Sequence, residues 1–177
     1  MSAQIRKIVL GVTGSIAAYK AADLIRRFQE QKCDVSVVMT KEAEHFITPL
    51  TLASLSGKNV VCDMFEQDGW KMGHLELAKA DALVIAPATA NTIAKLASGI
   101  ADDTLTTLAI SIKSKIFIAP AMNEDMYRNK IVQGNCEKLK KHGVKFIEPI
   151  KGKLACGIIG MGHLAEAEDI VKQVLGR

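Results

Sequence analysis

The hydrophobic positions along the chain follow two alternating patterns. Short, nearly continuous apolar runs rich in β-branched residues are typical of strands buried on both faces of a parallel sheet. Stretches with the apolar spacing of an amphipathic helix lie between them. The apolar runs predict strands at residues 7–12, 34–40, 59–65 (a weaker, edge strand), 81–87, 115–120 and 144–149. The amphipathic stretches predict helices at about residues 15–31, 75–79, 91–96, 103–112, 131–142 and 166–175.

Regular alternation of strands and helices predicts a three-layer α/β fold, Rossmann-like or flavodoxin-like, in which helices cover both faces of a parallel sheet. The chain has 177 residues, of which 49% are hydrophobic, and shows neither a linker nor an internal repeat. We therefore expect a single domain over residues 1–177. In such folds ligands bind outside the carboxyl ends of the strands, so the loops that follow the strands are the places to look for a site.

Composition narrows the classes of function. Neither a basic, apolar leader nor an apolar run long enough to span a bilayer occurs, which predicts a cytoplasmic protein with no membrane association. Lys and Arg are scattered and aromatic residues make up 5% of the chain, which argues against nucleic-acid binding. The four cysteines are far apart, so we expect reduced thiols and no structural metal site. A net charge of +4 is compatible with a small anionic ligand.

The loop "GVTGS" after the first predicted strand is a candidate phosphate site. Gly14 lies in the strand-to-helix turn, and Ser15 is the expected N-cap, where free backbone N–H groups and the helix dipole favour an anion. The loop matches neither Walker A nor Gly-x-Gly-x-x-Gly. The second strand ends at Thr40, without the carboxylate that a dinucleotide site needs. A mononucleotide phosphate bound through Ser15 and Thr40 fits better than NAD, and the alternative is a plain tight turn.

Two further loops carry polar residues where helices are expected to begin. Thr89, Asn91 and Thr92 follow one strand, and ordinary capping is the favoured interpretation there. Asn123 follows the next strand, where an amide can either cap a helix or hold a substrate carboxylate. Spacing alone favours capping at Asn123 as well.

Two residues of the chain suit proton chemistry. His74 is expected at the start of a helix at the ligand-binding edge, and an imidazole transfers protons near neutral pH, although a lone histidine is more often structural. Cys156 lies in "KGKLACGIIGMGHLAE", residues 151–166, which contains four glycines. That segment is too rich in glycine for a stable helix or central strand, so it could be a phosphate cradle, a mobile lid or a surface loop. A cysteine there lacks the usual buried setting, which favours a chemical role for its thiol.

Taken in order, these segments resemble the flavin-containing cysteine decarboxylases. The match includes "KIVLGVTGSIAAYKA", "GHLELAKADALVIAPATANTIAKLASGIADDTLTT", "IAPAMNEDMY" and "KLACGIIGMGHLAE", and it extends over essentially the whole chain. Each motif is weak alone, but four in register are highly specific. Within the family, the chain is most similar to the branch that acts on 4′-phosphopantothenoylcysteine in coenzyme A biosynthesis.

The resemblance implies FMN as the cofactor and a homotrimer with the flavin at the subunit contacts; in some members trimers assemble into dodecamers. It implies that Gly14, Ser15 and Thr40 hold the FMN phosphate. It also implies further flavin contacts: Phe46 near the flavin, often across the subunit interface, and, along the flavin and ribityl chain, Ala88, Thr89, Ala90 and Asn91.

The resemblance also implies a reaction. The substrate is oxidised to a thioaldehyde, loses CO2 and is reduced to 4′-phosphopantetheine. His74 would manage proton transfer during oxidation, Asn123 would grip the carboxylate, and Cys156 would donate the final proton. The remaining implied substrate contacts are Met122 beside Asn123 and, in the clamp that carries Cys156, Ala155 and Gly157. The clamp, residues 151–166, is then expected to be a lid whose glycines allow motion, and cysteine ligation is expected from a separate synthetase.

Three positions depart from the commonest family pattern, and three alternatives compete with the main interpretation. Tyr127 stands where tryptophan is usual, Ile158 replaces an acid and His163 replaces an arginine, which leaves the grip of the clamp open. The alternatives are a peptidyl-cysteine decarboxylase that stops at the enethiol, a flavin prenyltransferase and a non-enzymatic flavin-binding regulatory subunit. The joint presence of His74, Asn123 and Cys156 favours the full cycle.

Overall fold

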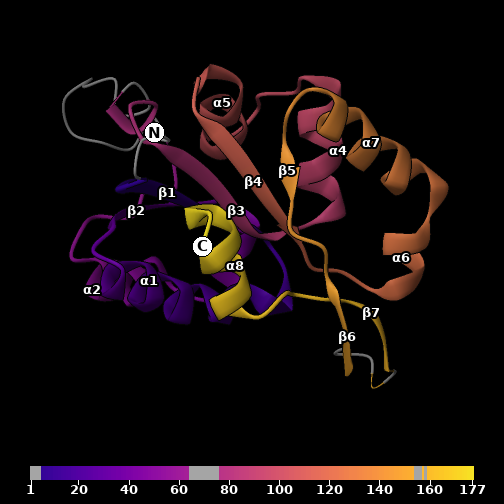
Figure 1. The fold of residues 1–177 in the computed structure, drawn as a ribbon, viewed down its shortest axis with the longest axis horizontal. Coiled ribbons are helices and arrows are strands. Elements are labelled where there is room, and N and C mark those ends of the chain that lie inside the picture. Colours follow the sequence, from indigo (N-terminus) through magenta and orange to yellow (C-terminus); the bar gives the residue numbers. More distant parts are fainter. Residues whose placement is uncertain (1–4, 64–75, 154–156, 158) are drawn as a thin grey trace.

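The computed structural model describes residues 5–63, 76–153, 157 and 159–177 (Figure 1). Its main sheet has five parallel strands in the order β2-β1-β3-β4-β5. This is the flavodoxin-like strand order, so the predicted α/β fold class is confirmed. The five strands are β1 Lys7–Val12, β2 Asp34–Met39, β3 Ala82–Ala88, β4 Lys115–Pro120 and β5 Lys145–Phe146.

Helices cover both faces of this sheet, as Figure 1 shows. One face carries α1, α2 and α8, and the other carries α4, α5 and α7. No helix in the described part of the chain is both long and apolar enough to cross a membrane. The α-helices are α1 Ala21–Glu30, α2 Pro49–Ser56, α4 Ala90–Ser98, α5 Thr104–Ser111, α6 Glu124–Arg128, α7 Lys130–Lys141 and α8 Ala167–Leu175. Two 3₁₀ helices, η1 Ile16–Lys20 and η2 Lys41–His45, follow β1 and β2.

Burial of both sheet faces explains the nearly continuous apolar strands. Every residue of β3 is buried, and so is every residue of β1 except Lys7. Successive side chains of a strand point to opposite faces. In β1, Leu10 packs into the core under α1 and α8, while Val9 packs into the core under α4, α5 and α7. The sheet therefore divides the interior into two apolar cores.

In the segment after β2, one prediction is wrong and one helix was not predicted. Residues 59–65 were expected to form a strand, but in the described part, 59–63, only Val61 pairs with the sheet, through a single bridge to Val38. The apolar residues of this segment were interpreted as a strand, but they lie beside β2 without forming an extended ladder. Helix α2 was not predicted, because "PLTLASLS" lacks an amphipathic period. Its end signals are nevertheless present, since Thr48 caps it and Gly57 ends it with a positive φ of 72°.

The glycine-rich segment forms a separate two-stranded antiparallel sheet, β6 Ile150–Lys153 and β7 Ile159–His163. Figure 1 shows this hairpin projecting from the end of the main sheet, beside α6. The segment is thus neither a helix nor a central strand, as expected, but its pairing as a hairpin was not predicted. The strand expected at 144–149 is shorter than predicted, with only Lys145 and Phe146 in β5.

The amino ends of β1 and β3 are joined by Asp81, far from the carboxyl edge of the sheet. Its Oδ2 accepts hydrogen bonds from the backbone N–H groups of Arg6, at 2.8 Å, and Lys7, at 2.7 Å. These two hydrogen bonds stabilise the carboxylate and lower the pKa of Asp81. Asp81 therefore contributes to the alignment of two central strands.

We predict that the contribution of Asp81 depends on pH. A lowered folded-state pKa gives stability that is present above the unfolded-state pKa of about 3.9 and is lost as the pH falls through the folded value. Asp81→Asn should lower the free energy of unfolding by about 1 kcal/mol at pH 7, a value reduced for solvent exposure. The deficit should shrink at acidic pH, which urea unfolding at both pH values measures. Asp23→Asn, which breaks an exposed pair with Arg27, is the control with a smaller effect. An equal deficit for Asp81→Asn at both pH values would contradict this account.

Candidate active site

Thr13 joins the loop after β1 to the loop after β3. Its buried hydroxyl donates to the Pro87 carbonyl at 2.7 Å and accepts from the Thr89 N–H at 3.1 Å. Both bonds are internal, so Thr13 holds two strand-end loops in one arrangement. Sequence reasoning did not select Thr13. The available signal was a hydroxyl residue between the glycines of "GVTGS".

The residues predicted to bind a phosphate meet at this edge. Ser15 caps η1 by accepting from the Ala17 N–H at 3.3 Å, and its hydroxyl donates to the Ala121 carbonyl at 3.3 Å. A Cβ on Gly14 would lie 2.5 Å from Cβ of Glu42, so only glycine allows the loop to approach η2 this closely. Thr40, the residue before η2, donates its N–H to the Val12 carbonyl at 3.0 Å. Gly14, Ser15 and Thr40 thus belong to one local structure.

The Thr40 hydroxyl has an unusual environment. The residue is only 5% exposed, and its Oγ1 has no hydrogen-bond partner within the part of the chain that the structure describes. A buried polar atom without a partner costs free energy and needs an explanation. A ligand oxygen beside the loop of Gly14 and Ser15 would provide the missing hydrogen bond.

The segment from Ala88 to Asn91 begins α4 at the same edge. Ala88 is buried at the end of β3, and Thr89 caps α4 by accepting from the Thr92 N–H at 3.2 Å. Capping, the interpretation favoured from the sequence, is therefore confirmed at Thr89. Ala90 is partly buried and Asn91 is exposed. Phe46, at the end of η2, leaves 44% of its surface exposed.

Asn123 begins α6 at the carboxyl end of β4. Its side-chain oxygen accepts from the Asp125 N–H at 2.8 Å, so capping is confirmed here too. The residue is exposed, with its side chain at the ligand-binding edge that the fold predicts. The preceding residue, Met122, donates its N–H to the Gly162 carbonyl of β7 at 3.0 Å. The clamp hairpin thus contacts the loop that carries Asn123.

Two clamp glycines allow this contact. Gly162 has a φ of +127°, and a Cβ there would collide with the Met122 carbonyl oxygen, while a Cβ on Gly160 would meet the Glu124 carboxylate. These two glycines allow close packing. From the sequence, the clamp glycines were expected to allow motion, and this packing role was not predicted. Gly157 is exposed and has a φ of +87°, and no atom of the described residues lies within 4 Å of where its Cβ would be.

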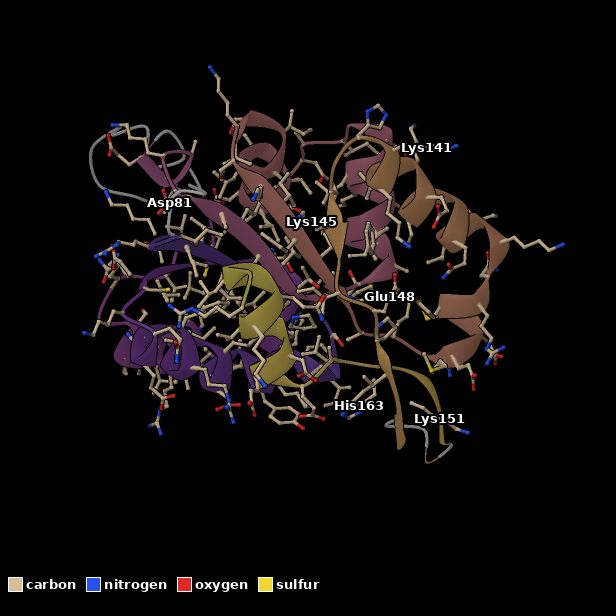
Figure 2. All side chains as sticks on the ribbon, in the orientation of Figure 1. Asp81, Lys141, Lys145, Glu148, Lys151 and His163 are labelled. Carbon is tan, nitrogen blue, oxygen red and sulfur yellow. The ribbon has the colours of Figure 1, made fainter. Side chains whose placement is uncertain are left out.

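A second contact joins the clamp hairpin to η1. The Lys20 ammonium lies 2.9 Å from Nε2 of His163, with both side chains partly buried. Figure 2 labels His163 and Lys151 on the hairpin. The first loop, the Asn123 loop and the clamp therefore form a continuous series of contacts. His74, Ala155, Cys156 and Ile158 lie outside the described residues, so their predicted roles stay predictions. Within the described ranges, no group of three or more His, Cys, Asp or Glu residues is arranged to hold a metal ion.

Comparison with known proteins gives the family. The model of the Flavoprotein family matches residues 1–177, so the chain belongs to the flavoprotein family. A "probable phosphopantothenoylcysteine decarboxylase" of Streptococcus mutans is 46% identical over 173 residues, which is 96% of this chain and 97% of that protein. The "coenzyme A biosynthesis bifunctional protein CoaBC" of Vibrio vulnificus is 45% identical over 168 residues, 94% of this chain. The chain spans only 42% of the length of that bifunctional relative.

Solved structures share the fold. A cysteine-to-serine variant of PPC decarboxylase, complexed with pantothenoylaminoethenethiol, matches with a TM-score of 0.85 and 34% identity over 97% of both chains. The FMN-dependent cysteine decarboxylase SpaF matches with a TM-score of 0.81 and 31% identity over 97% of this chain and 98% of that chain. The site loops described above therefore belong to a fold in which relatives carry out flavin chemistry.

We predict that the two packed glycines differ in importance. Gly162→Ala places a Cβ against backbone in a conformation that side chains rarely adopt, whereas Gly160→Ala meets the Glu124 side chain, most closely at its movable carboxylate end. Gly162→Ala should therefore detach β7 from the Asn123 loop and speed hydrogen exchange at the Met122 amide by roughly tenfold or more. Gly160→Ala should change that exchange much less. Equal exchange in the two variants would show that the Gly162 contact does not hold the hairpin.

Proposed function

We propose that the chain catalyses FMN-dependent decarboxylation of 4′-phosphopantothenoylcysteine to 4′-phosphopantetheine. The observation that carries the proposal is the 46% identity to the Streptococcus mutans relative, over nearly the full length of both chains. The geometry adds support, because the loops after β1, β2, β3 and β4 meet at one edge of the sheet, where α/β folds bind ligands. The proposed decarboxylase activity and the proposed substrate both rest on this identity and this geometry.

The loop after β1 and the end of β2 fit an FMN phosphate. Gly14 and Ser15 would present the start of η1 to the phosphate, and Thr40 would supply a hydroxyl that lacks a partner among the described residues. Ala88, Thr89, Ala90 and Asn91 would line the ribityl chain, and Phe46 would pack near the flavin. Bound FMN would supply a hydride acceptor and donor and so make loss of CO2 from a cysteine carboxylate feasible.

Asn123 is suited to orient the substrate carboxylate. The α6 cap uses the side-chain oxygen of Asn123, and the amide nitrogen is the donor end of the side chain, the end that would bind a carboxylate. A carboxylate held there would keep the C–C bond that breaks aligned with the neighbouring π system. Met122 would contact the substrate beside it.

His74 and Cys156 would transfer protons. During oxidation the substrate loses a hydride and a proton, and His74 would manage that proton transfer. After CO2 leaves, the substrate regains a hydride and a proton, and Cys156 would donate the proton, so the cycle has no net redox change. Ala155 and Gly157 would contact the substrate from the clamp.

The rival functions differ in their products. A peptidyl-cysteine decarboxylase would release an enethiol from a peptide ending in cysteine, a flavin prenyltransferase would not release CO2 from a cysteine derivative, and a regulatory subunit would bind flavin without turnover. The Vibrio vulnificus relative is named as a bifunctional protein of coenzyme A biosynthesis. A separate synthetase as the upstream partner stays a prediction. Action in the cytoplasm stays a prediction.

We expect the purified, FMN-loaded protein to convert 4′-phosphopantothenoylcysteine to 4′-phosphopantetheine, detected by mass spectrometry. A peptide ending in cysteine is the matched competing substrate. Processing of the peptide alone would favour the peptidyl alternative, and flavin binding without turnover of either would overturn the enzyme proposal.

Two substitutions separate the steps of the same assay. Cys156→Ser should accumulate the enethiol, which has two hydrogen atoms fewer than the product, because it lacks the final proton donor. His74→Asn should retain FMN but lose oxidation. Normal product formation by Cys156→Ser would refute the proton-donor role, and loss of FMN from His74→Asn would indicate a structural role instead.

A homotrimer, with dodecamers as a further assembly, would cover apolar surface beside the proposed cofactor site. Tyr19 of η1 is 58% exposed, and Leu50 of α2, four residues after Phe46 in the sequence, is 76% exposed. Light scattering should give three times, or twelve times, the chain mass of 19.1 kDa. Phe46→Ser should weaken the assembly, whereas Ile131→Ser, at an apolar position on α7 that is more exposed than Phe46, should not. A monomeric wild-type protein would exclude subunit contacts at this site.

A further inference from the structure

The helix that begins at Asn123 has little to hold it in place. Helix α6 has five residues, and none of them is buried. A single helical turn is unstable without external contacts, because nucleation is costly and few backbone hydrogen bonds repay it. Its ion pair between Arg128 and Glu124, 2.8 Å, lies within the helix and does not attach it to the rest of the molecule. The position of Asn123 must therefore depend on other contacts.

Tyr127 makes two contacts that attach α6 to its surroundings, in addition to the packing against β7. Its hydroxyl donates a hydrogen bond to Oε2 of Glu148, and its carbonyl accepts from the Gln133 side chain of α7 at 2.5 Å. Its own N–H donates to the Asn123 carbonyl at 2.9 Å, so Tyr127 lies one helical turn from the cap residue. A shift of Tyr127 would therefore also move Asn123, because the two residues belong to the same helical turn.

Glu148 connects this ring to the base of the clamp. Figure 2 labels Glu148 where the chain passes from β5 to β6, beside α6 and α7. Its Oε1 accepts from the Lys140 ammonium at 3.1 Å, and Lys140 also lies 5.4 Å from the centre of the Phe146 ring. Glu148 thus connects the segment between β5 and β6 to both α6 and α7.

The ionisation states of Tyr127 and Glu148 favour the hydrogen bond between them. Partial burial favours the neutral form of Glu148, but the hydrogen bonds from Tyr127 and Lys140 outweigh it and leave the pKa of Glu148 below its ordinary value. Burial, and then the hydrogen bond to Glu148, raise the pKa of Tyr127. At neutral pH the carboxylate therefore accepts while the phenol stays protonated and donates.

We propose that Tyr127 and Glu148 are positioning residues, which hold α6 so that Asn123 presents its amide to the substrate carboxylate. The proposal rests on the proposed function. It assigns to Glu148, a residue outside every motif of the sequence analysis, a role in aligning the bond that breaks. Neither residue needs to touch the substrate, because both act through the turn of α6.

The test compares matched variants of the full chain. Tyr127→Phe removes only the hydroxyl, Glu148→Ala removes the acceptor, and Glu148→Gln keeps an oxygen that can accept. Arg128→Met is a control that breaks the ion pair within α6, and Glu137→Gln is a control that touches Lys140 but not Tyr127. Hydrogen exchange of the α6 amides in the chain without substrate measures positioning independently of activity.

We expect Tyr127→Phe and Glu148→Ala to speed α6 exchange and to lower kcat by roughly three- to tenfold, since a misplaced reacting group costs rate. KM should change less, and the double variant should be no worse than either single variant, because both remove one interaction. Glu148→Gln should retain most of kcat, and the two controls should stay near wild type. A purely structural role would lower the amount of folded protein without this split between kcat and KM.

The failures are distinguishable. If the wild-type protein is active and Glu148→Ala matches the controls in both exchange and kcat, the positioning role is overturned and the proposed function stands. If Glu148→Ala alters exchange but kcat is unchanged, Glu148 holds α6 without serving catalysis, which also overturns the proposal. If the wild-type protein does not turn over the substrate, the proposed function is wrong and the catalytic role assigned to both residues is wrong with it.

Discussion

The hydrogen bond from the Met122 N–H to the Gly162 carbonyl is the contact on which the arrangement of the candidate site depends. It brings the clamp hairpin, which projects from the main sheet, against the loop that carries Asn123. Only a glycine permits it, because Gly162 combines a positive φ with a backbone neighbour where a Cβ would lie. The contact between His163 and Lys20 then attaches the same strand to η1. The proposed substrate and cofactor loops therefore share one framework.

Two threonines at the candidate edge of the sheet differ in how their hydroxyls are bonded. Thr13 has its hydroxyl fully used between two loops, whereas the Thr40 hydroxyl is buried and lacks a partner among the described residues. The first arrangement stabilises the framework, and the second leaves an unsatisfied group at the edge where a phosphate is expected. Two threonines at the ends of adjacent strands thus differ because of what surrounds them. The sequence marks Thr40 as a residue at the end of a strand, but it does not show how either hydroxyl is bonded.

Much of the fold could be predicted from the sequence. Strands β1 to β4 lie within about one residue of their predicted bounds, because strands buried on both faces need unbroken apolar runs. The predictions failed where the hydrophobic pattern of a segment does not match its surroundings in the folded chain. Residues 59–63 have strand-like composition but pair only at Val61, and α2 has clear end signals without an amphipathic face. Of the site, the loops were predicted, whereas Thr13, Lys20 and Glu148 were not, since their partners are distant in sequence.

The sequence by itself determined the α/β class, the edge at which the candidate site lies and the candidate residues Ser15, Thr40 and Asn123, because periodicity and capping are local properties of the chain. The tertiary structure decided what those residues contact. It gave the glycines at 160 and 162 a packing role, paired His163 with Lys20, and joined Tyr127 of α6 to Glu148 in the segment between β5 and β6. Such contacts depend on how separate elements approach one another, and that approach is set by the packing of the two cores rather than by any single segment.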